Sequence, residues 1–292
     1  QACLRHQAQR SIRRFPCTRS CQGSRMSTMA LSRWTFVSLV GAACAITLRS
    51  PSPSGRSGEA AVKGNASLHA PRTGQAPCQC EANGATWHGP ARSAPKCIFI
   101  DLGAADGNTF NDFIANKYGP VSNCPSGGEW EAYLVEANPE FTPKLLSLQA
   151  AYPGKVHAMG STAAYTCAAS VTFNIDTDVA HNRWGSSMKT SFAGGKSVTV
   201  PTTNVIKLLA ESVIPDDWVM LKVDIEGAEY DLIPCLSNFA NATLVDRMYL
   251  EEHRHVKGAQ AKSVYSPQQY ATAKQKLTSL GVSIPDYFSQ TF

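Results

Sequence analysis

The sequence predicts an α/β domain in which a mainly parallel β-sheet carries helices on both faces. From Cys97 onward, apolar runs typical of buried strands alternate with longer segments typical of helices. Charged and small residues gather where several of the apolar runs end, and ligands bind beyond the carboxyl ends of the strands in such sheets. The 292 residues suffice for one sizeable domain with extensions.

Each expected strand is a short apolar run, and most are followed by a helix. Strands are expected at CIFIDL (97–102), AYLVEA (132–137), KVHAMG (155–160), WVMLKVDI (218–225), RMYLEE (247–252) and VSIP (282–285). Two shorter strands, at 170–175 and 197–202, flank an excursion rich in Gly and Ser. Helices are expected at 109–117, 139–151, 204–211, 227–236 and 266–281. The domain itself is assigned to residues 97–292.

The first 96 residues carry a formal charge of +11, whereas residues 97–292 carry −6. Residues 1–33 form a basic leader, which suits a transit peptide or translated upstream sequence. The uncharged segment in 34–48 is short of the ~30 Å that a hydrocarbon core requires, so it suits a signal-peptide core or a short signal-anchor. Residues 49–96 are rich in Ser, Pro, Gly and Arg and are predicted to be a disordered stem.

These segments favour the secretory pathway, in the lumen or membrane of the ER or Golgi, with a membrane tether through 34–48. An organelle reached by a transit peptide is the alternative. The ten Cys lack C-x-x-C pairs. Some would pair in an oxidising lumen, while Cys167 and Cys235 are equally compatible with small buried hydrophobic residues. Because the basic excess lies outside the domain, we expect no nucleic-acid partner.

The first strand runs into a small-residue turn, FIDLGAADGNTF. Small residues let the backbone approach a ligand at the amino end of the next helix. Acids before and inside the turn disfavour a pyrophosphate and favour a cationic, ribose-containing ligand such as S-adenosylmethionine, although a purely structural turn would need the same glycines. The candidate cofactor-binding residues here are Asp101, Gly103, Ala105, Gly107, Asn108 and Thr109.

The second strand ends at Glu136, in YLVEANPEF. A carboxylate at this position can accept hydrogen bonds from both hydroxyls of a ribose. The alternative is an exposed acid with no ligand. The Gly- and Pro-containing insertion 118–129 accounts for the unusual distance between Glu136 and the glycine turn.

The segment LKVDIEGAEYDLI, 221–233, places three charges at a strand end. Lys222, Asp224 and Glu226 alternate and should therefore project to one side. Charges at the end of an apolar strand are costly unless they are paired or solvated in a cleft. These three residues are candidate catalytic residues, and an ion pair that merely holds the turn is the alternative.

Roughly residues 97–280 resemble the FkbM-type methyltransferase family. The motifs that carry the resemblance are, in sequence order, IFIDLGAADGNTF, YLVEANPEF, GSSM at 185–188 and LKVDIEGAEYDLI. The resemblance implies a Rossmann-like class I fold with a seven-stranded sheet. It also implies S-adenosylmethionine as methyl donor and transfer to an oxygen, often a hydroxyl of a sugar or natural product. The long loop at 118–129 departs from the family and affects the choice of substrate.

The segment YLEEHRH follows the next strand and also resembles the family. His253 is the candidate general base, because an unperturbed imidazole titrates near working pH. Glu252 and His255 are expected to face solvent or to pair with Arg254. We assign no metal ligands, although a divalent cation held by Asp224, Glu226 and His253 is a minor alternative.

The sequence therefore predicts an S-adenosylmethionine-dependent methyltransferase that acts on a hydroxyl of a glycan or small molecule. The first alternative is a non-catalytic binding module that keeps the fold. A Golgi-type glycosyltransferase is disfavoured, because the only D-x-D motif, Asp176-Thr177-Asp178, falls in an expected loop. The acceptor and the oligomeric state are not predicted.

Overall fold

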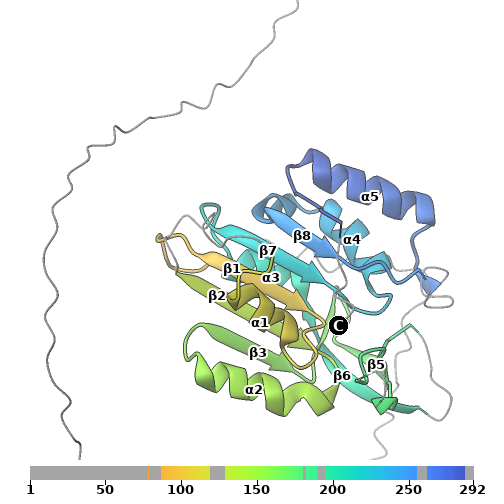
Figure 1. The fold of residues 1–292 in the computed structure, drawn as a ribbon. Helices are drawn as coiled ribbons and strands as arrows, with labels where there is room; N and C mark the ends of the chain where they lie inside the picture. Colours follow the sequence, from red (N-terminus) through yellow and green to blue (C-terminus); the bar gives the residue numbers. More distant parts are fainter. Residues whose placement is uncertain are drawn as a thin grey trace, which may run out of the picture. The chain divides into compact units, whose positions relative to one another are not determined.

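The computed structural model describes residues 78, 87–118, 129–179, 182–189, 195–254 and 262–286 (Figure 1). All of them belong to one compact unit, Ser67–Phe292. The predicted leader 1–33 and apolar segment 34–48 lie outside the described residues. Within the described ranges, no helix has the length and apolar character needed to span a membrane.

A five-stranded parallel sheet forms the centre of this unit, in the order β3-β2-β1-β7-β8. Its strands are β1 (Cys97–Leu102), β2 (Trp130–Glu136), β3 (Val156–Gly160), β7 (Trp218–Val223) and β8 (Arg247–Leu250). The predicted α/β class with a parallel sheet is confirmed. The described part of this sheet has five strands rather than the expected seven. The expected strand at 282–285 contributes only a bridge from Ser283 to Arg247, and the expected strands at 170–175 and 197–202 belong to a separate sheet.

The strand order creates a switch point between β1 and β7. From β1 the chain continues through β2 to β3 on one side, and it then returns to place β7 and β8 on the other side. The connections after β1 and β7 therefore leave the sheet in opposite directions and open a crevice at the carboxyl ends of these strands. The sheet order thus places the predicted site motifs at one crevice.

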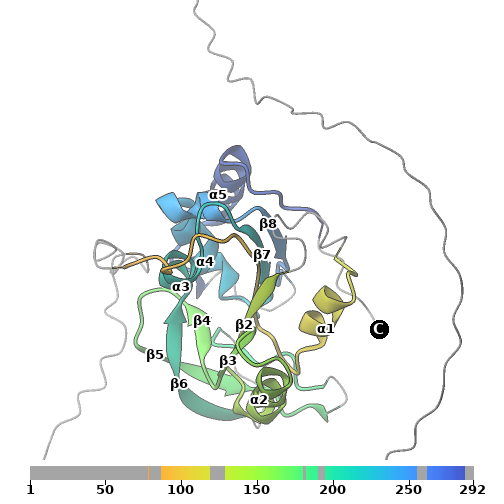
Figure 2. The same cartoon turned by 90° about the vertical axis from the view of Figure 1, so that its left-hand side faces the viewer.

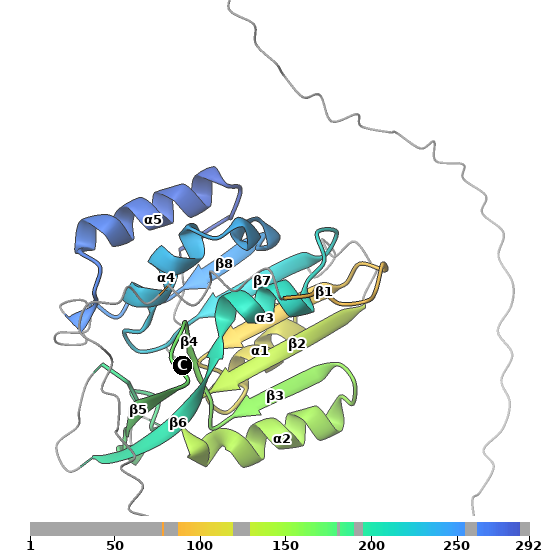
Figure 3. The same cartoon turned by 180° about the vertical axis from the view of Figure 1, so that it is seen from behind.

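Helices cover both faces of the sheet, as predicted (Figures 2 and 3). One face carries α1 (Asn108–Ile114) and α2 (Thr142–Ala151), which is preceded by the 3₁₀ turn η3 (Pro139–Phe141). The other carries α3 (Val205–Ser212), α4 (Glu229–Ser237), the 3₁₀ turn η5 (Ala240–Leu244) and α5 (Pro267–Ser279). The start of α5 is fixed by a reciprocal capping box between Ser266 and Gln269.

A second sheet stands beyond the carboxyl ends of the parallel strands (Figure 1). It contains β4 (Ala163–Tyr165), β5 (Ser170–Ile175) and β6 (Lys196–Asn204) in the order β4-β6-β5. The strands predicted at 170–175 and 197–202 pair with each other antiparallel. The three-residue strand β4 was not predicted, because it is too short to show a recognisable pattern of apolar residues.

The central strand β1 is buried along its whole length and supplies side chains to both faces. Ile98 and Ile100 pack in the cluster that includes α3, α4 and α5. Phe99 points to the opposite face, where its ring stacks on Phe113 of α1 with the ring centroids 4.6 Å apart. This two-sided burial explains why the strand is a continuous apolar run that ends at its first acid, Asp101.

The described residues before β1 are attached to the domain by a disulfide and by side-chain contacts. This corrects part of the prediction that residues 49–96 form a disordered stem. Cys78 forms a disulfide with Cys235 of α4. Trp87 packs against Phe239, and Arg92 forms a half-buried ion pair with Asp217. Cys235 is therefore a disulfide partner rather than a free buried thiol. Cys97 and Cys167 are also disulfide-bonded.

We expect the Cys78→Ser variant to be less stable than the wild type by about 2–5 kcal/mol, because the disulfide closes a long loop. Its two cysteines are 157 residues apart in the sequence. Denaturant unfolding under non-reducing conditions measures the difference. In excess reductant, the variant and the reduced wild type should unfold at the same denaturant concentration. Equal stabilities without reductant would contradict this role of the disulfide.

Candidate active site

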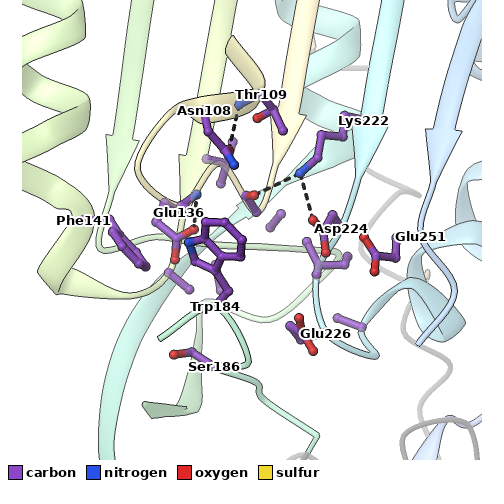
Figure 4. A pocket seen from close by; sticks show the side chains of 18 of the residues that line it. Asn108, Thr109, Glu136, Phe141, Trp184, Ser186, Lys222, Asp224, Glu226 and Glu251 are labelled. Atoms are coloured by element: carbon purple, nitrogen blue, oxygen red, sulfur yellow. Dashed lines mark hydrogen bonds and ion pairs between the residues drawn. The ribbon is translucent and has the colours of Figure 1, made fainter. Parts of the chain in front are cut away.

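A pocket opens at the carboxyl ends of β1, β2, β7 and β8 (Figure 4). Its far wall comes from the second sheet, through residues of β4 and β5. The empty space amounts to about 1160 Å³ when the open solvent at the mouth is included. The pocket therefore occupies the crevice that the sheet topology predicts.

The glycine turn after β1 forms the top of this pocket. Gly103 has a φ of +85°, and a Cβ on it would lie 1.8 Å from the carbonyl oxygen of Asp224. Only glycine permits this close approach of the β1 and β7 ends. Gly107, with a φ of +82°, begins α1, and a Cβ there would overlap Leu148 of α2. Gly107 thus serves helix packing, whereas Gly103 lines the pocket itself.

Asp101 lies behind the turn rather than in the pocket. Its carboxylate is fully buried, accepts a hydrogen bond from the Thr109 hydroxyl and lies 3.3 Å from the Lys222 ammonium. Burial raises the pKa of Asp101 above its usual value, although Lys222 and Thr109 oppose that rise. Asp101 is therefore a support that holds two pocket-lining residues, Thr109 and Lys222.

Glu136 is the pocket's most clearly positioned carboxylate. The backbone N–H of Ala105 donates to one of its oxygens at 2.8 Å, and that of Asn138 donates to the other at 2.6 Å. Burial nevertheless raises the pKa of Glu136 to about 7. Each oxygen keeps a further lone pair, so the carboxylate can accept two more hydrogen bonds from a ligand.

Lys222 ties the ends of β1 and β7 together. Its ammonium lies 3.1 Å from Asp224 Oδ2 and 3.2 Å from the carbonyl oxygen of Gly103, besides its contact with Asp101. Burial raises the pKa of Asp224, but Lys222 and His253 together have a larger, opposite effect. The pKa therefore falls below its usual value, to about 2. Lys222 therefore has three acceptors that hold its ammonium in place, and its catalytic role stays a prediction.

The turn after β7 has an unusual backbone. Glu226 has a φ of +50° and Gly227 a φ of +101°, so two successive residues adopt the left-handed conformation. The N–H of Gly227 donates to the buried carboxylate of Glu229 at 2.7 Å. The hydroxyl of Ser187 donates to the Glu226 carbonyl oxygen at 2.6 Å. These bonds hold the Glu226 side chain at the pocket wall.

His253 lies buried beneath the pocket, with carboxylates on both sides of its ring. Its Nδ1 is 3.2 Å from Glu229, and its Nε2 is 3.2 Å from Glu226 and 3.4 Å from Asp224. Burial lowers the pKa of His253, but these carboxylates outweigh burial and raise it to about 12. Nε2 of His253 therefore contacts two carboxylates of the pocket wall, and the general-base role of this residue stays a prediction.

Glu252, the neighbour of His253, makes ion pairs with Arg254 and Lys274 outside the pocket, so the pairing predicted with Arg254 is confirmed. His255 lies outside the described residues.

Of the eleven predicted site residues, eight line the pocket: Gly103, Ala105, Asn108, Thr109, Glu136, Lys222, Asp224 and Glu226. The other three, Asp101, Gly107 and His253, lie directly behind lining residues and hold the turn, α1 and the two carboxylates in place. The pattern of small and charged residues at strand ends therefore located the site well. It did not distinguish residues that face the pocket from those that support it.

The lining residues that were not predicted individually include Trp184, Phe141 and Glu251. The indole of Trp184 is 41% exposed at the pocket. It directly precedes the GSSM motif, in which Ser186 contacts Asn138 after β2 and Ser187 contacts Glu226 after β7. The motif therefore links two sides of the pocket, and this position next to a recognised motif was the only sequence signal for Trp184.

A family model covers the part of the chain that forms this pocket. The model of the family described as "Methyltransferase FkbM domain" matches residues 101–281, which is more than half of the chain. The chain belongs to the FkbM methyltransferase family. A search of curated proteins and a search of solved structures found no match. The matched range begins at Asp101 and contains every residue that lines the pocket.

We expect the Lys222→Met variant to be less stable than the wild type by about 3–5 kcal/mol, because it leaves the buried Asp101 carboxylate without its cation. Adding Asp101→Asn should restore part of that loss, since it removes the uncompensated charge. Chemical denaturation of the single and double variants measures both effects. If the double variant were no more stable than Lys222→Met alone, the ion pair would not be the cause.

Proposed function

We propose that this FkbM-family protein uses S-adenosylmethionine to methylate a hydroxyl group of a glycan or small molecule. The family supports methyl transfer, and membership generally implies this donor. The observation that carries the proposal is Glu136, a carboxylate held by two backbone N–H groups at the wall of a pocket formed by a glycine turn. A carboxylate so placed suits the two hydroxyls of a ribose.

The pocket's chemistry fits this donor better than it fits a phosphorylated nucleotide. Asp224, Glu226 and Glu251 line one side, and Lys222 is engaged by its own acceptors. Carboxylates favour a sulfonium and an ammonium and disfavour a pyrophosphate. The aromatic faces of Phe141 and Trp184 line the Glu136 side and offer apolar surface for an adenine.

The donor supplies an electrophilic methyl group when it is bound. The chain's own residues then have to hold the acceptor oxygen in line with that methyl and keep the site arranged, and such positioning can supply much of the rate. Asp224 and Glu226 present carboxylate oxygens at the pocket wall, where they can hold an acceptor hydroxyl. His253 contacts both carboxylates through its Nε2 and so helps to hold them in place.

The alternative of a glycosyltransferase loses support at its only D-x-D motif. The Asp176 carboxylate accepts hydrogen bonds from the backbone N–H groups of Asp178 and Gly185. Its own backbone N–H donates to Ser186. Asp176 therefore holds the loop before the GSSM motif, and neither acid of the motif lines the pocket.

We also propose that the protein works in an oxidising compartment of the secretory pathway. The disulfide between Cys78 and Cys235 supports this location, because disulfides form and persist in such compartments and are rare in the cytosol. The fastening of Cys78 suits a chain whose preceding residues connect the domain to a membrane tether or a cleaved signal. Organelle targeting by the leader is the alternative.

Calorimetric titration of the purified protein with S-adenosylmethionine tests the proposed function. We expect one molecule to bind per chain, and we expect release of S-adenosylhomocysteine when hydroxyl-bearing glycans are added. Absence of binding would contradict the use of this donor. Binding without turnover on any hydroxyl acceptor would favour the non-catalytic module.

The Glu136→Gln variant should bind S-adenosylmethionine about tenfold more weakly, because a hydrogen bond to a charged acceptor contributes about 1.5–3 kcal/mol. Wild-type affinity should also fall by about tenfold from pH 8 to pH 6, because the Glu136 carboxylate, whose pKa is about 7, becomes protonated. Asp101 raises and Lys222 lowers this pKa from behind the turn. The affinity of the Glu136→Gln variant should depend less on pH than that of the wild type. Any pH dependence that remains in the variant reports titration of the ligand itself.

Glu211→Gln is the matched control for Glu136→Gln, because Glu211 lies on α3 and pairs only with the exposed Lys207 in the same helix. This control should keep wild-type affinity and the wild-type pH profile. Equal affinities of the wild type and Glu136→Gln at pH 8 would refute the ribose role.

A further inference from the structure

The end of β7 and the end of β8 bring two carboxylates and one imidazole together. One oxygen each of Asp224 and Glu226 and one ring nitrogen of His253 lie within 4.8 Å of one another. Nε2 of His253 is 3.4 Å from Asp224 Oδ1 and 3.2 Å from Glu226 Oε1. Adjacent corners of an octahedron around a divalent cation are about 3 Å apart when the ligand distances are ~2.1 Å. The two distances from Nε2 to the carboxylate oxygens are therefore close to the spacing of adjacent metal ligands.

The histidine is oriented as metal-bound histidines are. Glu229, which is fully buried, lies 3.2 Å from Nδ1 and also accepts a hydrogen bond from the His253 backbone N–H at 3.0 Å. Its second oxygen is held by the N–H of Gly227. A carboxylate behind Nδ1 fixes the ring with Nε2 toward the metal side, as in carboxylate–histidine–metal triads. Glu229 supplies none of the three candidate ligand atoms, so it is free to orient the ring that supplies one of them.

The carboxylates around the His253 ring also favour binding of a further cation. Asp224, Glu226 and Glu229 surround the imidazole, and Glu251 lies 3.9 Å from the same Nε2. Lys222 is the cation that pairs with Asp224 on its other side, and it is shared with Asp101. Carboxylates in excess of their cations are costly in a half-buried site.

We propose that Asp224, Glu226 and His253 bind one divalent cation at the acceptor side of the pocket. Two carboxylate oxygens and one imidazole nitrogen suit Mn²⁺ or Zn²⁺ better than Ca²⁺, which prefers oxygen ligands alone. Asp224 and Glu226 line the pocket, so coordination positions opposite the protein ligands face the space in which the acceptor would lie. Glu251 is close enough to contribute through a bound water.

The role of this ion rests on the proposed function. A hydroxyl bound to the cation loses its proton more easily, because the positive charge stabilises the alkoxide. The acceptor O–H bond breaks and its proton passes to water. The new O–CH₃ bond then forms as the S–CH₃ bond breaks, which leaves the methyl ether and S-adenosylhomocysteine. The cation would thus supply the activation of the acceptor hydroxyl.

Titration of the EDTA-treated full chain with Mn²⁺, in the absence of S-adenosylmethionine, tests the site. Binding is measured by calorimetry and by the electron paramagnetic resonance signal of the ion. We expect one ion per chain, and affinity lowered at least tenfold in Glu226→Gln and in Asp224→Asn. Glu226 is partly exposed, so its variant should fold even if a His253 variant does not; circular dichroism checks this. Glu252→Gln is the matched control and should keep wild-type affinity.

Failure of this proposal differs from failure of the proposed function. Absence of Mn²⁺ and Zn²⁺ binding at millimolar concentration, or binding that Glu226→Gln leaves unchanged, would overturn the metal site. Neither result would affect binding of S-adenosylmethionine, which is measured separately in EDTA. Conversely, Mn²⁺ binding that depends on Glu226 would support the site even if the methyl donor did not bind.

Discussion

The arrangement of the site depends on the ammonium of Lys222, which joins the ends of the two central strands. It contacts Asp101 at the end of β1, the carbonyl oxygen of Gly103 in the turn and Asp224 at the end of β7. The absence of a Cβ on Gly103 allows the turn to lie directly against Asp224. The buried Lys222 ammonium therefore holds both edges of the switch-point crevice, and with them the backbone that lines the pocket.

A second constraint is the charge of the pocket. Its carboxylates face inward from three strands, and Lys222 and the His253 ring are each in contact with more than one acid. Such a pocket suits cationic ligands, because each cation that enters lowers the cost of holding the carboxylates together. The proposed sulfonium donor on the Glu136 side and the proposed divalent cation on the Asp224 side would meet this requirement at two different places. The same charge distribution disfavours nucleotide phosphates.

Much of the fold and the position of the site could be predicted from the sequence, because both depend on local patterns. Apolar runs gave the strands, and the alternation of Asp224 and Glu226 with apolar residues placed both carboxylates at the pocket. The raised pKa of His253 could not be predicted, because it depends on carboxylates from separate segments that only folding brings together. Likewise, the contact of Cys78 with α4 and the position of Trp184 are set by tertiary packing of loops.

The central claim is that Glu136 and the glycine turn hold the methyl donor. A crystal structure of the protein with S-adenosylhomocysteine tests it most directly. The account predicts that both ribose hydroxyls lie within hydrogen-bonding distance of the Glu136 carboxylate and that the sulfur faces the ends of β1 and β7. A ligand bound elsewhere, or a ribose that makes no contact with Glu136, would contradict it.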